Sequence, residues 1–106
     1  MRLFAACAVA AIGLSLGATG APAQSFNCNY AKTPDEVLIC QVPRLSDLDE
    51  RMSSLYFRLR NSLSGRPLRT LDADQKEWLA ERMACGRDIA CIAEAYGRRI
   101  RQLKEF

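Results

Sequence analysis

The chain has 106 residues, with 15 Lys and Arg against 12 Asp and Glu, and a formal net charge of +3. This small positive charge argues against a nucleic-acid-binding protein, which needs a strongly basic surface. The sequence contains no histidine, which removes the commonest catalytic base and the commonest nitrogen ligand of zinc.

The first 23 residues have the composition of a secretory signal peptide. Arg2 supplies the positive start, residues 3–16 are almost wholly apolar, and Ala21–Ala23 forms a small-x-small cleavage site. The apolar run is too short for a membrane anchor. We therefore expect cleavage after this site and a mature domain of residues 24–106 in the periplasm or outside the cell, with no stable membrane anchor.

The cysteines of the mature chain predict disulfides. Cleavage removes Cys7, and the cysteines that remain are Cys28, Cys40, Cys85 and Cys91. An even number of thiols in a short exported domain implies two bridges. Zinc binding would need closer cysteine spacings and further soft ligands, and thioredoxin-like chemistry would need a C-x-x-C motif. We expect no metal and no cofactor.

Four thiols allow three pairings, and the sequence alone does not choose among them. We favour Cys28–Cys40 with Cys85–Cys91, because each pair flanks a turn that leads into a helix. A crossed arrangement would instead join the N-terminal segment to the C-terminal hairpin, and it remains the alternative.

A short helix is expected over residues 33–40. Thr33 can cap it, Pro34 suits its first turn, and Glu36 stands three residues after the cap, as a capping box requires. A long helix should follow over residues 44–63, where apolar side chains recur every three or four positions. Residues 64–67 contain glycine and then proline, which should end it.

The third helix should begin after Thr70 or Asp72 and stop at Gly86, and Asp88 should cap the last helix. The periodicity is helical throughout the mature chain. It predicts an all-α fold: a small disulfide-stapled bundle of three main helices plus one short N-terminal helix. The expected core residues are Leu48, Met52, Tyr56, Trp78, Leu79, Tyr96 and Ile100.

Two arginines fall on apolar helix faces. Arg82 lies four residues after Trp78, and Arg99 has a similar place beside the stripe of the last helix. A guanidinium beside a core needs an anion nearby, because burying an unpaired charge is costly. We therefore predict a semi-buried ion-pair network in which Arg82 and Arg99 meet Glu36 and Asp49.

No nucleophile–base constellation is present, so we expect no catalytic residue and no enzyme. An 83-residue helical domain also offers little room for a glycosidase cleft with paired carboxylates. Two helices joined by "CGRD" could pass for a helix-turn-helix. The mature charge, 14 basic minus 12 acidic residues or +2, and the expected export both argue against DNA.

Several blocks of the mature chain resemble the lysozyme-inhibitor LprI-like family of secreted bacterial proteins. The blocks are Phe26–Cys28, Thr33–Cys40, Leu45–Tyr56, Gln75–Cys85 and Cys91–Leu103. The residues at the family's characteristic places are Pro34, Glu36, Ile39, Cys40, Leu48, Asp49, Trp78, Leu79, Arg82, Cys85, Cys91, Tyr96, Arg99 and Ile100. The resemblance covers essentially the whole mature chain and implies a compact helical domain of the cell envelope.

The resemblance also implies a protein partner, lysozyme, whose occlusion would protect peptidoglycan. Many lysozymes are basic, so an inhibitor with a charge of +2 would need a local acidic patch. The candidate acidic residues are Asp47, Glu50, Asp72, Asp74 and Glu77, with Asp49 beside the first two. The alternative is a structural or interaction module of the envelope with an unrelated protein partner.

Overall fold

The computed structural model describes residues 25–106. The elements in chain order are a short 3-10 helix, η2 (Cys28–Tyr30), then α1 (Pro34–Gln41), α2 (Pro43–Ser62), α3 (Gly65–Ala84) and α4 (Ile89–Lys104). These described residues contain no strand, so the predicted all-α bundle of three main helices and one short N-terminal helix is confirmed. The predicted signal peptide, residues 1–23, lies outside the described residues.

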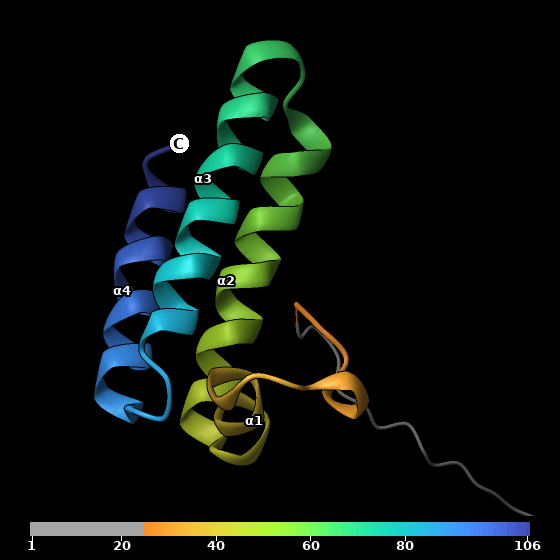
Figure 1. Ribbon diagram of the computed structural model, residues 1–106. Helices are drawn as coiled ribbons and strands as arrows, with labels where there is room; N and C mark the ends of the chain where they lie inside the picture. The colour runs from red at the N-terminus through yellow and green to blue at the C-terminus, as the bar shows by residue number, and fades with distance from the viewer. Residues whose placement is uncertain (1–24) are drawn as a thin grey trace, which may run out of the picture.

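The three long helices lie side by side. In Figure 1, α2 and α3 form a long antiparallel hairpin, and α4 runs along both of them. The short helix α1 lies at the end of the hairpin opposite the α2–α3 turn and contacts α2 and α3. Within residues 25–106, no helix combines the length and apolarity needed to cross a membrane.

Two disulfides lie at the end of the bundle opposite the α2–α3 turn. Cys28 in η2 is joined to Cys40 near the end of α1, with a Cα–Cα distance of 5.9 Å. Cys85 after α3 is joined to Cys91 in the first turn of α4, with a Cα–Cα distance of 5.6 Å. Both distances are usual for a disulfide, and the pairing is the one favoured from the sequence.

Two of the predicted helix caps are present. Glu36 accepts hydrogen bonds from the backbone N–H groups of Lys32, at 2.9 Å, and Thr33, at 3.4 Å. Asp88 accepts one from the backbone N–H of Cys91 at 3.0 Å. These bonds satisfy backbone donors that have no partner inside the helix.

The prediction for the start of α3 was wrong. The helix begins at Gly65 rather than after Thr70 or Asp72, and only residues 63 and 64 separate it from α2. Proline is tolerated in a first helical turn because the N–H it lacks would be unpaired there. Pro67 therefore begins a helix here instead of interrupting one. Gly65, with φ 62°, makes the sharp reversal of the chain.

The core lies between α1, α2, α3 and α4. The buried hydrophobic residues are Leu38, Ile39, Leu45, Met52, Leu71, Trp78, Ile92, Ala95, Tyr96, Ile100 and Leu103. Of the expected core, Leu48, Tyr56 and Leu79 are only partly buried and pack against its margin. Leu71 was not among the expected core residues, and it lies close to the predicted start of α3, which was placed after Thr70 or Asp72.

Candidate functional site

The interior contains a polar cluster centred on Arg82, which is 4% exposed. Its Nε donates to Oδ2 of Asp35 at 2.8 Å, and its Nη1 donates to the Tyr96 hydroxyl at 3.3 Å. The guanidinium also lies 5.5 Å from the ring centroid of Phe26 and 5.6 Å from that of Trp78. One cation therefore joins α3 to α1, to α4 and to the N-terminal segment.

Asp49 on α2 extends this cluster. Its carboxylate is fully buried and accepts the Tyr96 hydroxyl at 2.7 Å. It also accepts both the backbone N–H of Ser25, at 2.7 Å, and the Ser25 hydroxyl, at 2.8 Å. Tyr96 thus links Asp49 to Arg82, and each buried polar group has a hydrogen-bond partner, as stability requires.

The surroundings of Asp35 and Arg82 favour the charged forms of both side chains. Burial alone would raise the pKa of Asp35, but hydrogen bonds from Thr33 and Arg82 outweigh burial and hold that pKa below its ordinary value. Burial would also lower the pKa of Arg82, yet the Tyr96 oxygen and Asp35 raise it. Burial, together with the negative charge of Asp49, raises the pKa of the Tyr96 hydroxyl and keeps it protonated.

A second buried arginine, Arg99 on α4, has a different environment. Its Nε donates to Oε1 of Gln75 at 2.9 Å, and its other nitrogens donate to Gln102 at 3.2 Å and to the Leu71 carbonyl at 3.4 Å. None of these acceptors carries a charge. Burial lowers the pKa of Arg99.

The predicted ion-pair network needs correction on three points. The carboxylate that pairs with Arg82 is Asp35, because Glu36 is engaged in capping α1. Asp49 reaches Arg82 only through the Tyr96 hydroxyl. Arg99 contacts neutral oxygens instead of a carboxylate. The spacing of Asp35 and Ile39, four residues apart on one helix face, was the signal that could have identified the missing partner.

The buried carboxylates hold the fold together, while Arg82 also lines a pocket of about 340 Å³ together with Phe26 and Leu79. Asp35 and Asp49 have no solvent exposure, whereas a catalytic carboxylate must reach its substrate. Contacts with a partner must therefore come from the surface. Among the described residues, no group of three or more potential metal-ligating side chains is found.

The predicted acidic candidates divide by environment. Asp47, Glu50, Asp74 and Glu77 are exposed, while Asp49 is buried. Asp72 accepts from both Nε and Nη2 of Arg60, at 3.0 and 2.8 Å, and from the Tyr56 hydroxyl at 2.8 Å. The Arg60 hydrogen bonds lower the pKa of Asp72. This contact joins α2 to α3 and leaves Asp72 less available to a partner.

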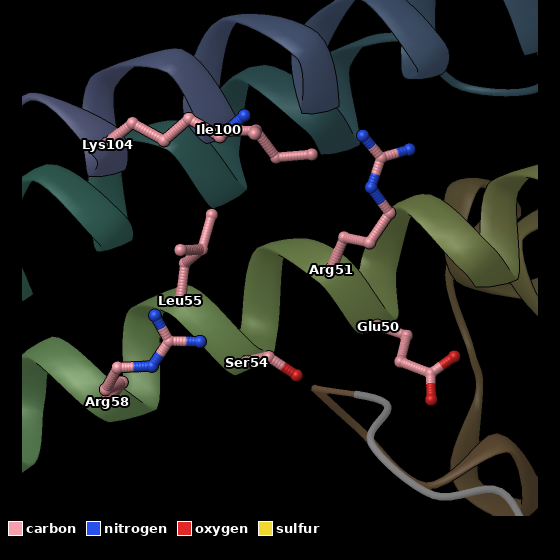
Figure 2. Close-up of a pocket in the computed structure, with 7 residues that line it drawn as sticks. All are labelled: Glu50, Arg51, Ser54, Leu55, Arg58, Ile100 and Lys104. Atoms are coloured by element: carbon pink, nitrogen blue, oxygen red, sulfur yellow. The ribbon is translucent and has the colours of Figure 1, made fainter.

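A groove of about 390 Å³ runs between α2 and α4. Its apolar lining comes from Leu55 and Ile100, and Figure 2 shows Leu55 pointing from α2 toward α4 while Glu50 points away. The cations along the groove are Arg51, Arg58 and Lys104. All three are exposed, and none lies within ion-pair distance of a carboxylate of the described residues.

Comparison with known proteins gives one consistent result. The family described as Lysozyme inhibitor LprI matches residues 28–103. Proteins named Lipoprotein LprI, from Mycobacterium bovis and from two strains of Mycobacterium tuberculosis, are 34% identical over 106 residues, which cover 90% of this chain and 52% of each relative. The chain thus spans about half the length of these relatives. No solved structure gives a significant match. Because the family match covers most of the chain, from the first cysteine of the first disulfide to Leu103 in the last turn of α4, the chain belongs to the lysozyme inhibitor LprI family.

Proposed function

We propose that this chain is an exported protein that binds lysozyme and blocks its substrate groove, so that peptidoglycan is protected. The observation that carries the proposal is the family match over residues 28–103, which takes in the whole helical bundle. The two disulfides support a location outside the cytoplasm, because such bonds persist in oxidising compartments. The name of the relatives, lipoproteins, also fits an exported protein.

The protein would act by binding and not by chemistry. Its buried carboxylates, Asp35 and Asp49, are committed to Arg82, Tyr96 and Ser25, which supports a structural role for them. Two disulfides and a satisfied polar core make a rigid domain, and rigidity lowers the entropy lost on association. A rigid domain of this kind suits an inhibitor that must occupy an enzyme's groove.

The test is a titration of lysozyme activity with the oxidised mature chain, residues 24–106. We expect the rate at which a peptidoglycan suspension clears to fall in proportion to added protein at micromolar concentrations. The same preparation, reduced and alkylated at its four cysteines, is the control and should inhibit less. If the oxidised chain leaves several types of lysozyme fully active, the proposal fails and an envelope module with another protein partner becomes the better explanation.

A further inference from the structure

The α2–α3 hairpin carries an unbalanced charge. Between Glu50 and Asp72 the sequence has no acidic residue. The basic residues in that interval are Arg51, Arg58, Arg60, Arg66 and Arg69. Arg60 is neutralised by Asp72, but the other four arginines lie beyond ion-pair distance of any carboxylate of residues 25–106. Although the net charge of the chain is small, the segment between Glu50 and Asp72 is therefore strongly basic.

The end of this hairpin projects from the bundle. We define the hairpin tip as residues 61–69, which include the α2–α3 turn and the first turns of α3. In Figure 1 this turn lies beyond the C-terminal end of α4, so no other described element covers it. Arg66 and Arg69 are exposed, and because they are three residues apart on α3 they lie on one helix face.

The tip is also held in place. Leu63 and Leu68 are partly buried and pack against the core margin. Just below the tip, Asp72 of α3 accepts hydrogen bonds from Tyr56 and Arg60 of α2. These contacts fix the two helices of the hairpin relative to each other. A partner that binds the tip would not have to order it first.

The arginines of the tip are in an unfavourable place for stability. The N-terminal end of a helix carries partial positive charge, so a cation in its first turn, such as Arg66 here, is destabilising and an acid is stabilising. The first turn of α3 contains no acid, whereas the first turn of α1 contains both Asp35 and Glu36. A local rule broken at an exposed position is typical of a functional surface.

We propose that the hairpin tip is the inhibitory element, and that Arg66 and Arg69 enter the substrate groove of lysozyme and face its catalytic carboxylates. This inference rests on the proposed function and adds the surface that performs it. Glycosidases such as lysozyme carry two carboxyl groups in that groove. Guanidinium groups bind carboxylates through paired hydrogen bonds of fixed geometry. The arginines of the tip can thus be attracted to the carboxylates in the groove even if the surfaces of both proteins are otherwise basic.

This placement differs from the acidic patches considered from the sequence. Asp47 and Glu50, or Asp74 and Glu77, would bind a basic region outside the catalytic groove of lysozyme. The tip would instead compete directly with substrate. If the tip binds lysozyme, reversing the charge of its arginines should weaken inhibition, and reversing the charge of the acidic residues should not. If an acidic patch binds lysozyme, the opposite result is expected.

The experiment compares two double variants that change the net charge equally. In the first, Arg66→Glu and Arg69→Glu reverse the tip. In the second, Arg51→Glu and Arg58→Glu reverse the α2–α4 groove and leave the tip intact. We expect the half-inhibitory concentration to rise about 100-fold for the tip variant and less than about 5-fold for the groove variant. Inhibition by the unaltered chain should raise the apparent KM for peptidoglycan and leave kcat unchanged.

Thermal unfolding separates lost binding from lost folding. Acids suit the N-terminal turns of α3 better than arginines, so the tip variant should have an equal or higher Tm than the unaltered chain. The substitutions Arg66→Ala and Arg69→Ala, which add no new charge, should also weaken inhibition.

Each outcome decides between the alternatives. Equal inhibition by the tip variant and the unaltered chain would overturn the tip inference and leave the proposed function standing. The same holds if Asp74→Lys with Glu77→Lys abolishes inhibition and the tip variant does not, since the docking surface would then be acidic. Absence of inhibition by the unaltered chain would remove both proposals.

Discussion

The two buried arginines show two ways of placing a cation inside a small helical domain. Arg82 has a carboxylate, Asp35, at 2.8 Å and a second, Asp49, through the Tyr96 hydroxyl. Arg99 is 1% exposed and has only amide and carbonyl oxygens as hydrogen-bond acceptors. The first cation is compensated by charge, and the second by dipoles.

This difference follows from the elements that each arginine joins. Arg82 links α3 to α1 and, through Tyr96 and Asp49, to Ser25 near the start of the described chain. Arg99 links α4 to α3, which are already connected by a short turn and a disulfide. The charged cluster around Arg82 therefore holds together segments that are far apart in the sequence. The neutral cluster around Arg99 connects two helices, α3 and α4, that already follow each other along the chain.

The largest predicted effect comes from removing the paired cation. Arg82→Met should lower the free energy of unfolding by about 3–5 kcal/mol, because it leaves Asp35 buried without its partner. Arg99→Met should cost about 1–2 kcal/mol, since only neutral acceptors such as Gln75 lose a donor. Urea unfolding of the oxidised proteins measures both. Equal losses in the two variants would contradict the distinction drawn between the clusters.

A second prediction concerns acid. The folded state holds the pKa of Asp35 below the ordinary value of 3.8, so the unfolded chain takes up a proton first as the pH falls. The stabilisation is fully present above about pH 4 and is lost as the pH drops through the folded pKa.

Urea unfolding between pH 5 and pH 2 should therefore show a steep decline, and Asp35→Asn should flatten it. Arg99→Met is the matched control, and it should retain the steep decline because no carboxylate loses its partner. A slope unchanged by Asp35→Asn would show that other acids control acid stability.

The smallest predicted effect comes from the contact near the surface. Tyr56→Phe removes one hydrogen bond to Asp72 and should lower the free energy of unfolding by about 1 kcal/mol. Arg60→Ala should cost less than Tyr56→Phe, because the pair that Arg60 forms with Asp72 is open to solvent. If either substitution lowered the free energy of unfolding as much as Arg82→Met does, this contact would be as important for stability as the buried clusters.

Much of the fold could be predicted from local signals. The caps at Glu36 and Asp88 and the helical spacing depend on neighbours along the chain, and the even number of cysteines after residue 23 is also read directly from the sequence. The start of α3 was misplaced because Pro67 can either end a helix or begin one. Helix phase placed Arg82 and Arg99 near the interior, as observed.

The partners of those arginines were harder to predict, because they depend on how the helices pack. Asp35 and Glu36 are adjacent, and both suit the first turn of α1. Only the position of α1 against α3 decides which of the two faces Arg82. The hairpin tip was missed for a similar reason: the arginines along it are visible in the sequence, but its projection past α4 is visible only in three dimensions.

The two disulfides have a consequence for how the protein is made. Each joins cysteines close in the chain, with sequence separations of 12 and 6. In a chain exported as proposed, the first pair can therefore oxidise as soon as residues up to Cys40 have crossed the membrane, before α3 and α4 follow. Among the cysteines that the structure describes, Cys85 and Cys91 then have only each other as partners. Sequential oxidation of this kind gives the native connectivity without reshuffling, even where disulfide isomerase activity is low.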